Sequence, residues 1–81
     1  MNYVKILNNT ILDVRFVLNQ IDRNPAAEIT NIKQQLKAAL FTQPRYADKV
    51  DKLRSLHQVY DFSNRVISEL KNEIIIEREM N

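Results

Sequence analysis

Few residues in this chain could carry out chemistry on their own. His57 is the only histidine, and Asp61 lies one helical turn after it. Such a pair can orient an imidazole for proton transfer. No nucleophile or second acid–base group follows at a recognisable spacing, however. Because the chain has no glycine, phosphate-binding glycine loops, Rossmann turns and nucleophile elbows are excluded. We expect a surface pair and no enzyme.

A metal centre or a bound cofactor is not indicated either. The chain has no cysteine and one histidine, so a thiolate or imidazole zinc site cannot be assembled. Carboxylate pairs such as Glu73 and Glu77 fall on helix faces that look solvated. We expect no metal and no cofactor.

A group of basic residues follows Pro44. Arg45, Lys49 and Lys52 are spaced i, i+4, i+7, which puts them on one face of a helix. They could contact phosphates, although Asp48 and Asp51 interleave with them. The alternative function is therefore a small DNA-binding or phage-type transcriptional regulator. Its candidate nucleic-acid contacts are Arg45, Lys49, Lys52 and Arg54.

The elements that must position these residues follow from apolar spacing. The first segment has apolar residues spaced alternately by three and four, which predicts a helix over residues 2–22 with a continuous buried seam. The seam consists of Val4, Leu7, Ile11, Val14, Leu18 and Ile21. Four apolar residues lie off it, so this helix is apolar on more than one face and needs more than one neighbour: Phe16, Val17, Leu12 and Ile6.

Two prolines divide the rest of the chain. Pro25, with Asn24 as a predicted N-cap, opens a second helix over 25–41. Its apolar stripe is Ile29, Ile32, Leu36 and Ala39 or Leu40, typical of an outer helix with one buried side. Pro44 opens a third helix over 45–79. The connections are short, so neighbouring helices should be antiparallel.

The sequence is compatible with two forms of the third helix. A helix of about 35 residues would measure roughly 50 Å, against about 30 Å for the first. Asp61, Ser63 and Asn64 could cap a break near 61–63 and give four helices instead. We favour the continuous helix. The predicted fold is all-α, a small antiparallel bundle of three or four helices in a single domain over 1–81.

The end of the chain carries three adjacent isoleucines. Successive helical residues step about 100° round the axis, so Ile74, Ile75 and Ile76 span roughly 200° and cannot share one stripe. If the helix is continuous, we expect them to form an interface. If it breaks near Ser63, they fold into the core. The predicted interface consists of Tyr60, Phe62, Val66, Ile67, Leu70, Ile74, Ile75 and Ile76.

These patterns favour binding over catalysis. We predict a helical protein-interaction module that binds another protein or itself, as a homodimer or larger assembly, through this segment and the open side of the first helix. Chaperones, inhibitors, immunity proteins and adaptors share this size and build, by analogy of architecture alone. A self-assembling structural subunit is a third possibility. No apolar run approaches the length of about 20 residues that spans a bilayer, so we expect a cytoplasmic protein with no membrane partner.

Overall fold

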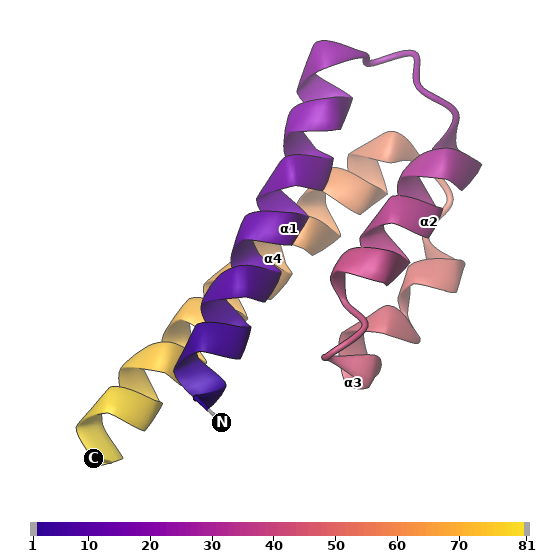
Figure 1. Ribbon diagram of the computed structural model, residues 1–81. Helices are drawn as coiled ribbons and strands as arrows, with labels where there is room; N and C mark the ends of the chain where they lie inside the picture. The colour runs from indigo at the N-terminus through magenta and orange to yellow at the C-terminus, as the bar shows by residue number, and fades with distance from the viewer. Residues whose placement is uncertain (1, 81) are drawn as a thin grey trace.

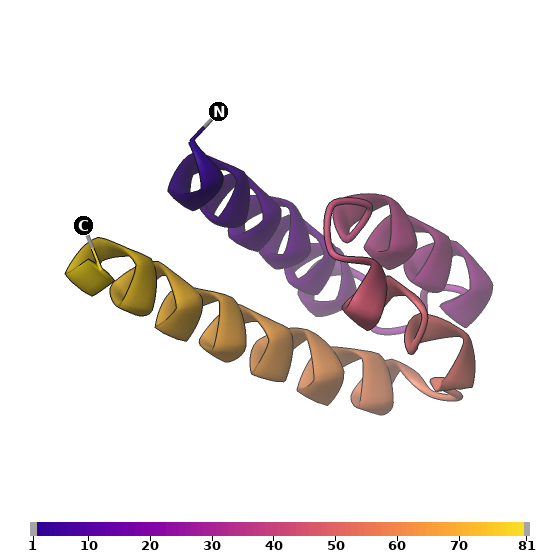
Figure 2. The same cartoon turned by 90° about the horizontal axis from the view of Figure 1, so that it is seen from below.

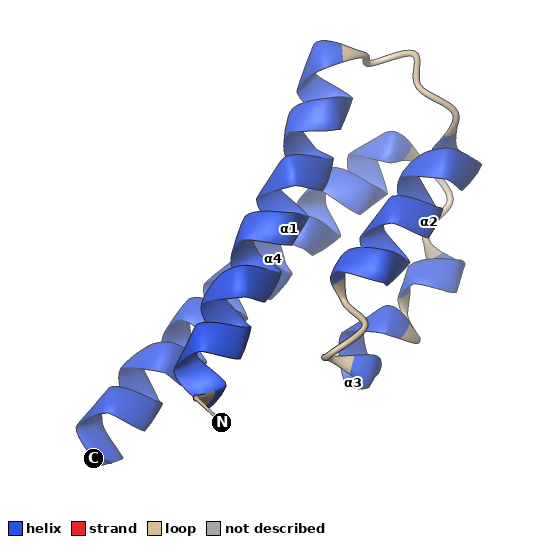
Figure 3. Ribbon diagram, viewed as in Figure 1, coloured by secondary structure: helices blue, strands red, loops and turns tan. Residues whose placement is uncertain are grey.

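The computed structural model describes residues 2–80 and is built from helices and loops, with no strand in that range (Figures 1 and 3). The all-α fold is therefore confirmed. The elements are α1 (Tyr3–Arg23), α2 (Ile29–Ala39), α3 (Pro44–Ala47), the 3-10 helix η1 (Val50–Lys52) and α4 (Leu56–Met80). The ends of the predicted 1–81 domain, Met1 and Asn81, lie outside the described residues.

The two long helices, α1 and α4, pair in opposite directions along most of their length and make the most extensive contact in the molecule (Figures 1 and 2). Both termini consequently lie at the same end. The short elements α2, α3 and η1 pack against the pair on one side, away from that end. The result is elongated, with extents of 44 × 23 × 19 Å.

Helix α1 forms close to its predicted bounds. It begins after Asn2, whose Oδ1 accepts a hydrogen bond from the Lys5 backbone N–H at 3.3 Å, the usual arrangement of an N-cap. Every seam residue is buried except Val4, which is half-buried. The seam therefore supplies one wall of a single apolar core shared by all the helices.

The second helix was predicted too long. Helix α2 begins at Ile29 rather than at Pro25, and Asn24 is the C-cap of α1 rather than the N-cap of α2. The Ala27 N–H donates to the Asn24 carbonyl at 3.0 Å, which closes a turn, and Glu28 is extended. These residues form the loop that reverses the chain (Figure 1). The predicted stripe is confirmed, because Ile32, Leu36, Ala39 and Leu40 are buried and Ile29 is partly buried.

The prediction of one helix over 45–79 was wrong. The helix that Pro44 opens ends at Ala47, and α4 begins only at Leu56. The alternative break near 61–63 was also wrong, because α4 is continuous there. Ser63 lies in its buried face, with an Oγ that has no hydrogen-bond partner among the described residues. With the break before Leu56, α4 has 25 residues against 21 in α1, so the two helices match in length.

The start of α4 is fixed by side chains. The Ser55 Oγ accepts a hydrogen bond from the Gln58 N–H at 3.1 Å, and the Gln58 Oε1 accepts one from the Arg54 N–H at 2.7 Å. This is a close variant of a capping box, in which a serine and a glutamine three residues later satisfy backbone donors before the first turn.

Two lysines of α2 hold the segment between α3 and α4 in place. The Lys33 Nζ donates to the carbonyls of Asp51 and Leu53, at 3.1 and 2.8 Å. The Lys37 Nζ pairs with the Asp51 carboxylate at 2.6 Å. Because carbonyls at the end of a helix have no partner within it, these contacts stabilise η1 against α2.

Candidate functional site

The predicted interface divides into a buried and an accessible part. Val66, Ile67, Leu70 and Ile74 lie in the intramolecular core. They lie on the side of α4 that packs on the rest of the bundle, chiefly on α1, because the two helices run side by side along most of their length. A partner could reach Ile67, Leu70 and Ile74 only if the helices separated, whereas Val66 also lines a surface cavity.

The remaining members stay accessible. Tyr60 of α4 is exposed, and Phe62 is half-buried. Ile75 and Ile76 are 53% and 51% exposed. The three isoleucines thus have different environments: Ile74 packs against α1, while the next two emerge on opposite flanks of α4 because each residue turns by about 100°.

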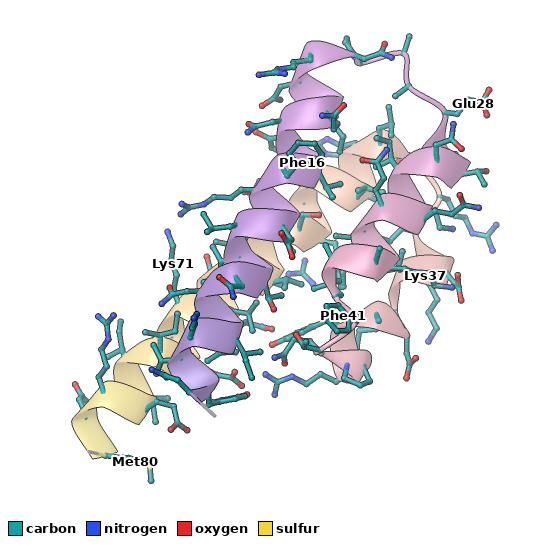
Figure 4. The ribbon with its side chains drawn as sticks, in the orientation of Figure 1. Phe16, Glu28, Lys37, Phe41, Lys71 and Met80 are labelled. Carbon is teal, nitrogen blue, oxygen red and sulfur yellow. The ribbon has the colours of Figure 1, made fainter. Side chains whose placement is uncertain are left out.

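Helix α4 extends past the start of α1. Its last turn lies beyond the first residues of α1, and Met80 is at its tip, 77% exposed (Figures 1 and 4). Tyr3 lies beside this end of α4, where its hydroxyl donates to Glu73 Oε2 at 3.3 Å, and it too is exposed. We call Ile75, Ile76 and Met80 the apolar tip.

A second exposed apolar site lies on α1. Leu12 and Phe16 are 61% and 60% exposed and one turn apart, on the face opposite the buried seam. Phe41, just after α2, is also exposed (Figure 4). The open side of the first helix was predicted to bind, but the predicted interface residues did not name these three. The positions of Leu12 and Phe16 outside the seam could have indicated that they are exposed. Phe41 belongs to no periodic stripe, so its spacing gave no such indication.

The basic residues do not form the predicted helical face. Because α3 ends at Ala47 and η1 follows, Arg45, Lys49 and Lys52 are not on one continuous helix. Arg45 pairs with Glu73 and lies over the Tyr46 ring, 4.7 Å from its centroid. Arg54 lies in the short link before α4.

Two of these residues instead meet α4 at a pocket. Lys49 and Lys52 line a surface cavity of about 330 Å³ together with Arg65 of α4. Its apolar lining comes from α4 and from the segment before it, and Glu69 of α4 is its one acidic lining residue. The full lining is Tyr46, Lys49, Lys52, Leu53, Phe62, Arg65, Val66 and Glu69. We call it the basic pocket.

The basic pocket has an excess of positive charge. Lys49, Lys52 and Arg65 make no ion pair with any residue from 2 to 80. The acidic residue Glu69 is already engaged, since it accepts a hydrogen bond from the Tyr46 hydroxyl. An apolar floor with uncompensated cations at its rim suits a group that is apolar and negatively charged.

Burial and the hydrogen bond to Glu69 raise the pKa of Tyr46 from 10.0 to about 12. The unfolded chain would lose this proton near pH 10, while the folded protein keeps it. We therefore expect the stability that Tyr46 contributes to be complete below pH 10 and to fall as the pH rises to about 12. Urea unfolding at pH 9 and pH 11 measures this. In Tyr46→Phe, which cannot ionise, the loss between the two pH values should be smaller. An equal loss in both proteins would contradict the assignment.

His57 and Asp61 form the expected surface pair. The His57 Nε2 lies 3.2 Å from Asp61 Oδ2, and both side chains are largely exposed. Such a solvated pair adds little stability. Within residues 2–80, no group of three or more histidine, aspartate or glutamate side chains is placed to hold a metal ion.

None of the helices in the described range combines the length and apolar character needed to cross a membrane. Comparison with known proteins gave no match to a family model, a curated protein or a solved structure.

Proposed function

We propose that this protein is a non-enzymatic helical module that binds another protein, or a second copy of itself, through the exposed end of α4. The observation that carries the proposal is the apolar tip: three large apolar side chains, each at least half exposed, lie within the last six residues of α4, Ile76 and Met80 on one flank and Ile75 on the other. Exposed apolar groups gathered in this way mark interaction surfaces.

Covering the apolar tip would gain a few kcal/mol of binding free energy in total, at roughly 1 to 2 kcal/mol for each residue. Fully burying an isoleucine or methionine is worth about 1.5 to 3 kcal/mol. Ile75 and Ile76 are already about half buried, so covering the tip would gain roughly 1 to 2 kcal/mol for each residue. That gain suits a binding surface with a small apolar centre and a charged rim. The open side of α1, with Leu12 and Phe16, offers a second such surface.

The chain is of the size of small adaptor, inhibitor, immunity and chaperone proteins, which act by contact alone. The lack of cysteine fits a reducing compartment, and we place the proposed activity in the cytoplasm. No membrane partner is part of this proposal.

The test adds charge at the tip. We expect the double variant Ile75→Glu with Ile76→Glu to lose association, because the substitutions replace apolar contact area with solvated carboxylates. Light scattering measures self-association, and affinity capture followed by mass spectrometry identifies other partners. Circular dichroism should show that the helices persist.

A matched control separates charge from apolar contact. Ser68→Glu with Asn72→Glu adds the same charge to the same helix at exposed polar positions, and should keep the association. If neither double variant changes binding, or if both reduce it equally, the apolar tip is not the binding surface.

Nucleic-acid binding is the second candidate, supported by the excess positive charge of Lys49, Lys52 and Arg65 at the basic pocket. It has less support, because Arg45 is taken up by Glu73 and the predicted face is broken. A mobility-shift assay at low salt tests it, since phosphate contacts are strongest there; no shift at low salt would exclude it.

A further inference from the structure

We propose that the basic pocket binds an acidic segment of a partner protein, in which one large apolar side chain is flanked by carboxylates. The pocket is then a second binding site, and the inference goes beyond the proposed function, which rests on the apolar tip. Both sites lie on α4, but two residues of α3 reach across that helix between them. Arg45 pairs with Glu73 there. Tyr46 donates a hydrogen bond to Glu69, so the two sites are separate surfaces.

The first argument is charge. Three cations from separate parts of the chain converge on the pocket: Lys49 follows α3, Lys52 belongs to η1, and Arg65 lies on α4. None of them has an ion-pair partner in the part of the chain from 2 to 80, and Tyr46 engages Glu69, the acidic residue of the lining. Like charges held around one hollow repel each other. A ligand that carries carboxylates offsets this repulsion, so the charges favour an acidic partner.

The second argument is the apolar surface between the cations. Leu53 and Phe62 are half-buried and pack against the core, and Val66 is buried. The cavity measures about 330 Å³, near the lower limit of the roughly 300 to 1,000 Å³ of small-molecule pockets. A hollow of this size has room for one large apolar side chain. The neighbours of that side chain in the ligand would then lie at the rim, beside the cations.

The third argument is that the pocket is formed before a ligand binds. One wall is α4, and the other is the segment from α3 to Leu53. Helix α2 holds this segment in place, because Lys33 donates to the carbonyls of Asp51 and Leu53 and Lys37 pairs with the Asp51 carboxylate. Neither wall needs the ligand to fix its position, so binding requires little ordering of the protein.

The lining suits an acidic peptide better than a nucleic acid. A phosphate backbone has no apolar side chain to place in the hollow, and the carboxylate of Glu69 would repel it. The described lining residues include no asparagine or glutamine, the side chains that pair with adenine. Nucleic-acid binding through the same cations is therefore the competing outcome of the test.

The probe is a fluorescein-labelled peptide with one phenylalanine and two glutamates on each side of it. Fluorescence anisotropy is measured as the 81-residue chain is added from micromolar to millimolar concentration. We expect saturable binding that weakens between about 50 and about 500 mM salt, because salt screens the charges. One control peptide has serine in place of phenylalanine, and another has glutamine in place of glutamate. Each should bind about tenfold more weakly or worse.

The protein variant Arg65→Glu should raise the dissociation constant of the peptide by about tenfold or more, because it replaces a cation at the rim by an anion. Lys71→Glu is the matched control, since it makes the same change of charge at an exposed position of the same helix. Lys71 is nine residues after Phe62, so it lies on the opposite flank of α4, away from α3 (Figure 4). The control should change the constant by less than about twofold, because salt screens charges beyond about 8 Å.

Circular dichroism on each variant verifies folding. If Arg65→Glu loses helical signal, Lys49→Glu takes its place, because Lys49 lies in the turn between α3 and η1. Peptide binding that needs the phenylalanine, the glutamates and the rim cation supports the inference.

Four results would overturn it: no binding of the peptide to the wild type, equal binding of either control peptide, equal weakening by the rim variant and by Lys71→Glu, or preference for nucleic acid. The last is tested with a labelled strand of about ten thymidines, whose phosphates contact cations without sequence preference. If the strand binds more tightly than the peptide and is lost in Arg65→Glu, the pocket is a phosphate site. None of these results involves the apolar tip, so the proposed function is tested separately by Ile75→Glu with Ile76→Glu.

Discussion

Replacing Leu70 by glutamate should unfold the protein. Leu70 is completely buried between α4 and α1, so the change removes a buried leucine worth about 1.5 to 3 kcal/mol. It also forces an unpaired carboxylate into the core, which costs several kcal/mol more. A folded chain of 81 residues has a stability of about 4 to 12 kcal/mol. The expected loss, about 4 kcal/mol or more, is comparable to that whole amount.

Circular dichroism at 25 °C measures this result as a loss of most of the helical signal. The control is Ile76→Glu, which introduces the same side chain six residues later on the same helix, at a half-exposed position. It should keep the signal and change the melting temperature little. A folded, monomeric Leu70→Glu protein would contradict the pairing of α4 with α1, and would place Leu70 on a surface.

Replacing Leu36 by alanine should cost about 2 to 5 kcal/mol, the range for truncating a fully buried leucine. Leu36 is completely buried on the inner side of α2. With 11 residues, α2 is shorter than the roughly 12 to 15 residues at which isolated helices become even marginally stable. It therefore depends on this packing, and the loss should be felt by the whole molecule.

Urea unfolding followed by circular dichroism measures the change. Leu12→Ala makes the same substitution at an exposed position of α1 and should stay within about 0.5 kcal/mol of the parent. If Leu36→Ala also cost less than about 1 kcal/mol, α2 would not be part of the cooperative core.

The architecture and most of the core could be predicted from apolar spacing. The seam of α1 and the stripe of α2 need only one helical period each, and burial follows the predicted faces. The break before α4 was missed because Tyr46, Val50, Leu53 and Leu56 keep helical spacing across it. In the structure these residues still turn toward the core, but from α3, from η1, from the link after η1 and from the first residue of α4, respectively. The period of the apolar residues indicates which side of a segment is buried. It does not indicate whether that segment is one continuous helix.

The signal for that break was present in another form. Ser55 and Gln58 have the spacing of a capping box, whereas Asp61 and Ser63, which we considered instead, have no glutamate or glutamine three residues later. Local hydrogen-bonding signals therefore locate a helix start better than the apolar pattern does.

The candidate site was predictable only in part. Three adjacent isoleucines must spread round the helix, so one or two of them had to be exposed. The position of α1 decides which of the three isoleucines are exposed. That position is set by packing between residues that are far apart in the sequence. The basic pocket could not be predicted at all, because it joins Lys49 and Lys52 to Arg65 across the break.

The pairing of the first long helix with the last has a consequence during synthesis. Helix α1 ends at Arg23 and its partner ends at Met80, so 57 further residues must be translated before the pair can be complete. At about 5 to 20 residues per second, the α1 seam would wait roughly 3 to 11 seconds on the nascent chain without its main neighbour. Early contact with α2 shields only part of the seam. During that interval the uncovered part of the seam is prone to aggregation, because transiently exposed apolar surface promotes association.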